Sequence, residues 1–276
     1  MDPGFLPEDV DLDRPNVARI YDWFLGGTAN WAVDRQFGDQ AVQAFPLVKA
    51  LARGNRAFLG RAVRYCLAQG ITQFLDLGSG IPTAGNVHEV ADDHADDTRC
   101  VYVDNDPVAV AHGRMLLDES GDPARHAVLH ADLRDARDVW EAALATGVLD
   151  PDRPICLLTV AVLHFLPDVT GVREAVRDYR TLLPPGSAYV LSHATESGVG
   201  GEELAQIRRL VALSERASSP AVSRSLGEIA AFFGNFDVVE PGIVPVGQWR
   251  PEPGAATVPL ASVVGGVGRK PGGPIT

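Results

Sequence analysis

The chain has 276 residues and a formal net charge of −12, and 46% of its residues are hydrophobic while 22% are charged. This composition is typical of a folded globular protein and excludes a largely disordered chain, and the acidic balance argues against a broad nucleic-acid-binding face. Three widely separated cysteines predict neither a disulfide framework nor a zinc site. No apolar stretch reaches the roughly 18 residues of a membrane span, and the leader lacks a signal core. We therefore expect a cytoplasmic protein that binds neither nucleic acid nor membranes.

The first seventy residues have helical periodicity. Asp13 can cap a helix that has Pro15 in its first turn, and the pair Gly26-Gly27 can end that helix. Two more helices are expected before residue 71. We therefore expect an N-terminal helical cap over residues 1–70, followed by one compact domain over residues 71–276.

From residue 71 onwards, short apolar segments rich in β-branched residues alternate with helical segments. This alternation predicts parallel strands joined by right-handed crossovers, which is a doubly wound, Rossmann-like α/β sheet. Near the C-terminus, two strand-like segments joined by a Pro-rich loop predict an antiparallel pair at one edge. The expected parallel strands are residues 71–77, 100–104, 127–132, 154–160 and 188–193.

The loop after the first of these strands is the most informative segment, and it reads DLGSGIPTAG. It lies between a strand and a helix, where open α/β sheets bind ligands. Asn86 stands where a P-loop needs Lys, Thr83 stands where a dinucleotide loop needs Gly, and a G-x-S-x-G elbow is absent. The remaining D-x-G-x-G pattern resembles the first motif of class I S-adenosylmethionine methyltransferases. A tight turn that binds no ligand is the alternative.

Acidic residues also follow the next two strands. Asp104 stands where a carboxylate can accept the ribose hydroxyls of an adenosine, whereas the alternative role of helix cap suits Asp106 better. Asp132 and Leu133 resemble the position that binds adenine through a carboxylate and a backbone N–H, although Asp132 or Asp135 could instead cap the next helix. These signals occur in chain order at successive strand ends, which favours S-adenosylmethionine as the ligand.

Longer stretches extend this resemblance to one family. They are RPNVARIYDWFLGGTANWAVDR, FLDLGSGIPTAGNVHEVA, VYVDNDPVAVAH, LTVAVLHFLPD, WRPE and VGRKP. Over roughly residues 10–270 the chain resembles the S-adenosyl methyltransferase family of high-GC Gram-positive bacteria. The resemblance implies a seven-stranded methyltransferase sheet with an antiparallel last strand, a helical cap over the cofactor, and S-adenosyl-L-methionine as ligand, but no particular acceptor. Val264-Gly265-Gly266 departs from the pattern where an aromatic residue is expected.

The first of these stretches mixes charged and aromatic residues around a glycine break, which is typical of a ligand-facing lid. Arg19 could pair with the methionine carboxylate, and the faces of Tyr21 or Trp31 could accept the sulfonium charge. For Tyr21 and Asn30, a place in the buried stripe of the helix is an equal alternative, and Phe24 is expected in the core.

These motifs and the resemblance together predict a cofactor site drawn from the cap and from successive strand ends. The predicted residues are Arg19, Tyr21, Gly27, Asn30, Asp76, Gly78, Ser79, Gly80, Asp104, Asn105, Asp132, Leu133 and Ala161. No metal is expected, because Asp104 and Asp106 have no evident third ligand.

Methyl transfer needs a general base only when the acceptor holds its proton firmly. His164, just past the fourth strand, is the candidate catalytic base, and His193 at the end of the fifth strand is the other candidate. Histidines in such places are often structural. We expect a methyltransferase that acts on an unidentified small molecule. The alternative is a protein that binds S-adenosylmethionine as a sensor or interaction module without turnover.

Overall fold

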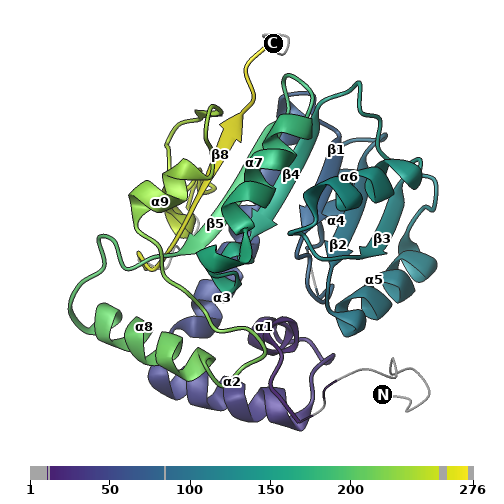
Figure 1. Cartoon of the computed structure of the whole chain (residues 1–276). Coiled ribbons are helices and arrows are strands. Elements are labelled where there is room, and N and C mark those ends of the chain that lie inside the picture. The colour runs from purple at the N-terminus through teal and green to yellow at the C-terminus, as the bar shows by residue number, and fades with distance from the viewer. Residues whose placement is uncertain (1–10, 12, 84, 255–259, 273–276) are drawn as a thin grey trace.

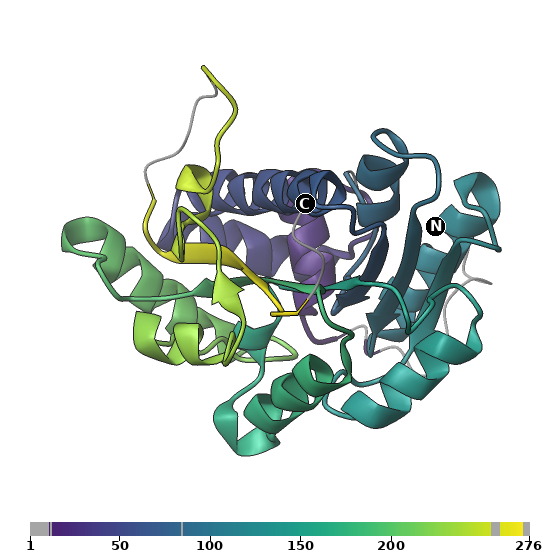
Figure 2. The ribbon, with the colours of Figure 1, turned by 90° about the horizontal axis from the view of Figure 1, so that it is seen from above.

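The protein folds around one open sheet with helices on both faces (Figures 1 and 2), and the structure, a computed structural model, describes residues 11, 13–83, 85–254 and 260–272. The order across the sheet is β3-β2-β1-β4-β5-β8-β6, and β7 also pairs with β8. The first five strands are parallel, and β8 is antiparallel to β5, β6 and β7. The predicted doubly wound α/β fold with an antiparallel end is confirmed. The strands are β1 (Gln73–Leu77), β2 (Arg99–Asp104), β3 (His126–His130), β4 (Ile155–Val160), β5 (Ala188–Ala194), β6 (Asp237–Val238), β7 (Val244–Pro245) and β8 (Val263–Arg269).

The helices are α1 (Val17–Leu25), α2 (Ala32–Ala44), α3 (Val48–Ala68), α4 (Val87–Asp92), α5 (Pro107–Ser120), α6 (Ala136–Ala145), α7 (Val172–Leu182), α8 (Gly201–Ser214) and α9 (Leu226–Ala231). The helices α1, α2 and α3 precede the first strand, and the others lie between strands. The start of α1 differs from the prediction, because its N-cap is Asn16 rather than Asp13. The Asn16 side chain accepts hydrogen bonds from the N–H groups of Ala18 and Arg19, which is the usual contribution of an N-cap residue.

The edge of the sheet differs from the seven strands that the resemblance implies. Both β6 and β7 pair with β8, so the described residues form eight strands. The segment between β6 and β7 contains Pro241 and Gly242. Proline has no N–H to donate to a strand ladder, so the last edge strand is divided into two short pieces.

The sheet is buried on both faces, and successive strand residues point to opposite sides. Leu75 and Leu77 pack in the cluster that contains α6, α7 and α9, whereas Phe74 packs with α3 and α4. Seen from above, the blue and purple helices lie on one side of the sheet and the teal and green α6 and α7 on the other (Figure 2). Burial on both faces explains why these strands are nearly continuous apolar runs in the sequence.

A third apolar cluster forms a cap at the carboxyl ends of the parallel strands. It joins α1, α2 and the start of α3 through residues such as Ile20 and Phe37, and it also includes Ile207 of α8. Figure 1 shows α8 beside α2, so the cap is built from two segments that are far apart in the sequence. Because α3 also contributes Phe58 to the sheet cluster, it connects cap and sheet. The domain boundary at residue 70 stays a prediction.

Gly265 of β8 explains how closely α3 packs on the sheet, and it generates a stability prediction. A Cβ on Gly265 would lie 2.7 Å from the Phe58 ring. We expect Gly265→Ala to lower the free energy of unfolding by about 1–3 kcal/mol, because the buried ring must shift. Gly227→Ala in α9 is the control, since its Cβ would meet nothing within 4 Å. Urea unfolding followed by circular dichroism measures both changes, and equal losses would contradict this account.

Candidate active site

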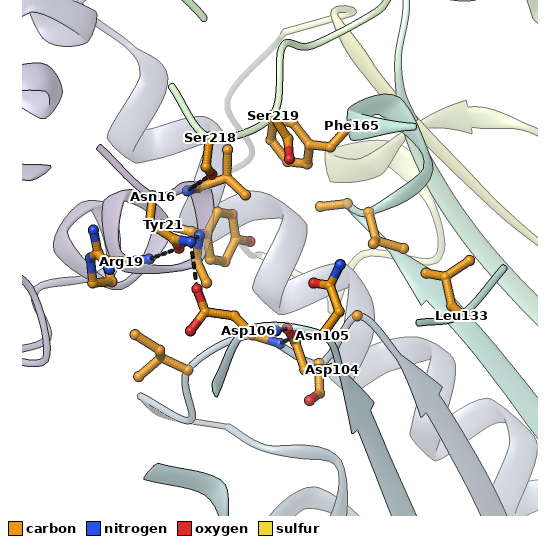
Figure 3. Close-up of a pocket in the computed structure, with 18 of the residues that line it drawn as sticks. Asn16, Arg19, Tyr21, Asp104, Asn105, Asp106, Leu133, Phe165, Ser218 and Ser219 are labelled. Atoms are coloured by element: carbon orange, nitrogen blue, oxygen red, sulfur yellow. Dashed lines mark hydrogen bonds between the residues drawn. The ribbon is translucent and has the colours of Figure 1, made fainter. Parts of the chain in front are cut away.

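A cavity of about 390 Å³ lies between the cap and the carboxyl ends of β1, β2, β3 and β4. This is the edge at which open α/β sheets bind ligands. In Figure 3, Asn16 and Tyr21 of the cap lie opposite Leu133, with Asp104, Asn105 and Asp106 below them and Phe165 above. The cavity therefore has walls from both the cap and the sheet, and we call it the cofactor cleft after the cofactor site that the sequence predicts there.

The two glycines of the D-x-G-x-G loop have positive φ angles, 68° at Gly78 and 66° at Gly80, but for different reasons. A Cβ on Gly78 would lie 2.3 Å from Val162, so this glycine permits close packing of the loop against the end of β4. Among the described residues other than its chain neighbours, a Cβ on Gly80 would meet no atom within 4 Å, although Gly80 lines the cofactor cleft. The space in front of Gly80 is therefore available to a ligand that approaches the backbone.

Asp104 lies at the end of β2 with only 8% of its surface exposed. Its Oδ2 accepts a hydrogen bond from the Gly80 N–H at 2.7 Å, and its Oδ1 accepts one from the Asp106 N–H at 2.9 Å. A carboxylate has about four lone-pair sites, so Asp104 keeps capacity toward the cleft. Burial raises its pKa to about 6. The role of cap for α5 belongs to Asp106, as the sequence predicts.

Asp76, at the end of β1, is a second buried carboxyl group in the cleft. It is 6% exposed, and among the described residues its side chain makes no hydrogen bond. Burial raises its pKa to about 7, and the neighbouring Asp104 adds to the rise while Arg56 opposes it. Such a strong shift in a cleft is typical of a functional group.

Arg19 of α1 already makes its hydrogen bonds to other residues of the N-terminal segment. Its Nε donates to Asp34 at 2.7 Å, and its Nη2 donates to the carbonyls of Asp11 and Arg14 at 3.2 and 2.9 Å. Its guanidinium also lies 4.4 Å from the centre of the Trp31 ring. In Figure 3 the Arg19 side chain points away from the space that the labelled residues enclose. Arg19 is among the residues that line the cofactor cleft, but its guanidinium, like the ring of Trp31, serves contacts inside the cap.

Arg56 of α3, which the sequence analysis missed, also lines the cofactor cleft. Its buried Nε has no hydrogen-bond partner within the described part of the chain, and no ion pair to Arg56 forms there. The pattern of α3 contained no signal for this role, because an arginine beside an apolar stripe is ordinary. Arg56 and Asp76 thus present opposite charges to one cavity.

A chain of hydrogen bonds joins the cap to the ends of β4 and β5. The Ala161 N–H donates to Ser192 Oγ at 2.9 Å, Ser192 donates to Asn55 Oδ1 at 2.6 Å, and Asn55 donates to the Tyr21 hydroxyl at 3.0 Å. Tyr21 in turn donates to the Ala52 carbonyl at 3.1 Å. The Tyr21 proton is therefore committed, and burial raises the pKa of Tyr21. A buried asparagine within the apolar stripe of α3 was the signal for this network.

Two further hydrogen bonds connect the cap to the loops of the sheet. Asn16 Nδ2 donates to Asp106 Oδ2 at 2.5 Å, and the Thr83 hydroxyl donates to Asp22 at 2.7 Å. Asp22 is 2% exposed and also accepts from Asn30 at 2.8 Å. Polar residues of the first sequence stretch thus attach the cap to the rim of the cleft.

The remaining predicted residues fall into two groups. Those that line the cleft are Ser79, Asn105, Asp132, Leu133 and Ala161. Gly27 and Asn30 lie behind the wall of the cleft, where a Cβ on Gly27 would lie 1.9 Å from Asp22.

Two of the lining residues have distinctive local geometry. Asp132 is also paired with Arg134, which lowers its pKa. Ala161 has a left-handed φ of 58°, which the hydrogen bonds to Ser192 hold in place.

The two candidate histidines lie outside the cofactor cleft. His193 Nε2 accepts from Arg224 at 2.7 Å and its Nδ1 donates to the Ala194 carbonyl at 2.6 Å, so both ring nitrogens are occupied. His164 is 8% exposed, and burial lowers its pKa well below the ordinary value. Neither histidine is therefore a strong base at neutral pH.

The described ranges contain no group of three or more His, Cys, Asp or Glu residues that could hold a metal ion, and the absence of a metal stays a prediction. Within the same ranges, no helix has both the length and the apolar character that crossing a membrane requires.

Comparison with known proteins first defines the class of fold. Magnesium protoporphyrin IX methyltransferase from Synechocystis PCC 6803 is 12% identical and aligns over 96% of this chain and 100% of its own, with a TM-score of 0.51. At this identity the likeness concerns the fold, which is that of class I methyltransferases. No curated protein matches the sequence.

Nearer relatives then define the family. Residues 4–271 match the model of a family described as S-adenosyl methyltransferase. A Thermobifida fusca YX protein, described as a candidate methyltransferase, is 36% identical over 98% of both chains, with a TM-score of 0.86. A DUF574 family protein from Streptomyces avermitilis MA-4680 is 34% identical over 95% of this chain and 99% of its own, with a TM-score of 0.88. The chain belongs to the S-adenosyl methyltransferase family, and S-adenosylmethionine is the methyl donor of that family.

The raised pKa of Asp76 predicts how stability depends on pH. In the unfolded chain an aspartate ionises near pH 4, whereas Asp76 ionises near pH 7 in the folded protein. The contribution of Asp76 to the free energy of unfolding is therefore fully present below about pH 4, and it is lost as the pH rises through about 7. Between these values the free energy of unfolding should fall by roughly 4 kcal/mol more in the wild type than in Asp76→Asn. Urea unfolding from pH 4 to 8 tests this, and parallel curves would refute it.

Proposed function

We propose that the protein transfers a methyl group from S-adenosylmethionine to a small-molecule acceptor. The observation that carries this proposal is the pairing of Gly80 with Asp104, in which an open glycine edge lies beside a buried carboxylate with spare acceptor capacity. A ribose needs both features, because its ring must approach the backbone and its hydroxyls must find an acceptor. Membership of the family supports the same donor.

The charges in the cleft also fit the methionine end of the donor. Asp76 suits an ammonium group, and Arg56 suits a carboxylate. We assign the carboxylate to Arg56 rather than to Arg19, because Arg19 already binds Asp34 and two carbonyls. Asp132 and the N–H of Leu133 remain the proposed contacts for adenine, and Ser79, Asn105 and Ala161 complete the wall.

The protein's own contribution to the reaction is mainly orientation and the exclusion of water. When bound, S-adenosylmethionine would supply an electrophilic methyl carbon. A lone pair of the acceptor bonds to that carbon while the carbon–sulfur electron pair stays on sulfur, S-adenosylhomocysteine leaves, and any proton on the methylated atom passes to water. The hydrogen-bonded chain through Asn55 fixes the ring of Tyr21 at the wall of the cleft. No lining residue of the cleft within the described ranges is a histidine. We assign Asp76 and Asp104 to the ammonium group and the ribose of the donor, so we assign no general base there.

Titration calorimetry and a methyl-transfer assay test the proposal. S-adenosylmethionine and S-adenosylhomocysteine should bind, whereas NAD and ATP should not. Equal affinity for NAD would overturn the assignment of the cleft. A protein that binds the donor but methylates no molecule in a screen of small metabolites would support the alternative, a sensor without turnover.

Asp104 provides the sharpest single-residue test. Asp104→Ala removes the acceptor of the ribose hydroxyls and should weaken binding of S-adenosylhomocysteine by roughly 2–4 kcal/mol. Asp118→Ala removes the same charge from an exposed position on α5 and is the matched control. Unchanged affinity in Asp104→Ala, measured by calorimetry, would assign that residue to the loop structure alone.

The two arginines should separate binding from folding. Arg56→Ala should weaken the binding of S-adenosylhomocysteine by roughly 10-fold or more and leave the binding of adenosine unchanged. Only S-adenosylhomocysteine has a carboxylate for Arg56 to bind. Arg19→Ala leaves Asp34 buried without its cation, so the free energy of unfolding should fall by about 3–5 kcal/mol. Calorimetry and urea unfolding on both variants check this, and the reverse pattern would return the carboxylate to Arg19.

A further inference from the structure

A second chamber of about 160 Å³ opens beside the cofactor cleft. It lies between α1, α2 and α3 on one side and α8 on the other, and apolar side chains such as Phe37, Phe45 and Val211 form most of its wall. The residues that line both cavities are Val17, Tyr21, Asn55, Ala161 and Phe165. Because these residues line both cavities, the chamber adjoins the cleft along them.

The two cavities differ in charge. The described residues that line the cofactor cleft include eight aspartates and arginines, whereas those that line the second chamber include no Asp, Glu, Lys or Arg. His164 belongs to the wall of the chamber, and it is neutral because burial lowers its pKa well below the usual value. A charged ligand would lose its hydration there without meeting an opposite charge. The chamber therefore selects neutral molecules.

Two buried polar atoms in this apolar wall lack partners. His164 Nδ1 and Ser262 Oγ make no hydrogen bond to any described residue. Their side chains belong to residues that are only 8% and 3% exposed, and both residues line the chamber. Buried polar groups in native proteins are nearly always hydrogen-bonded, so a hydroxyl group on an occupant that reached these atoms would supply a partner that the described residues do not.

We infer that this chamber is the acceptor site, and that the acceptor is a neutral, largely apolar molecule with a hydroxyl group. The inference rests on the proposed methyl transfer. A cavity of about 150 Å³ holds benzene, so a chamber of about 160 Å³ matches a molecule with one ring. The acceptor's reacting atom lies against the shared wall, where the chamber meets the cleft. His164 is then a positioning residue for the acceptor rather than the base for the reaction.

Three probes with the same ring test the chemistry of the chamber. In the presence of saturating S-adenosylhomocysteine, 4-ethylphenol should bind in a calorimetric titration, ethylbenzene should bind more weakly, and the anion 4-ethylbenzoate should not bind. Two single variants, His164→Phe and the smaller change Ser262→Ala, should each reduce the preference for 4-ethylphenol over ethylbenzene.

Two neighbouring positions on α8 test the location. Val211→Phe fills the chamber and should weaken 4-ethylphenol at least 10-fold, whereas Ala212→Phe adds the same ring at an exposed position and should change its affinity less than twofold. Both variants should bind S-adenosylhomocysteine like the wild type.

The failure of this inference is distinguishable from failure of the proposed function. No binding of 4-ethylphenol, equal binding of 4-ethylbenzoate, or full affinity in Val211→Phe would overturn the acceptor site while S-adenosylhomocysteine still binds. If the wild-type protein does not bind S-adenosylhomocysteine, the proposed function itself is overturned.

Discussion

The site depends on the burial of four carboxyl groups where the cap meets the sheet. Asp22, Asp34, Asp76 and Asp104 are between 0% and 8% exposed, and a buried carboxylate is tolerated only when donors or cations satisfy it. Asp34 receives Arg19 and two backbone N–H groups, and Asp22 receives Asn30 and Thr83. These two therefore hold the cap together and fasten it to the glycine loop.

The other two carboxyl groups have fewer hydrogen-bond partners within the protein, and both lie in the cofactor cleft. Asp104 accepts two backbone N–H groups at 2.7 and 2.9 Å, and Asp76 accepts no side-chain or backbone hydrogen bond among the described residues. Their raised pKa values follow from that burial. We propose that a ligand with hydroxyl and ammonium groups completes the set of partners that the protein leaves open.

The cap also separates two environments beneath it. On the side of the sheet it covers a cleft lined by charged groups, and on the side of α8 it encloses a chamber whose described lining carries no formal charge. The hydrogen-bonded chain from Ala161 through Asn55 to Tyr21 runs along their shared wall. The residues of that chain carry no formal charge and bond to one another, which suits the place where a polar donor meets an apolar acceptor.

The sequence by itself determined the doubly wound sheet and the edge at which the cleft lies. Strand alternation, the D-x-G-x-G loop and Asp104 are local patterns, and parallel strands bring their carboxyl ends to one edge whatever the rest of the chain does. Only the tertiary structure decided the partners of Arg19, the place of Arg56 in the lining of the cleft and the place of α8 in the cap. Those outcomes depend on contacts between segments far apart in the sequence, and burial then decides which charges are neutralised within the protein and which remain for a ligand. The same physical reason explains the second chamber, since an apolar helix face does not reveal in the sequence whether another helix fills it.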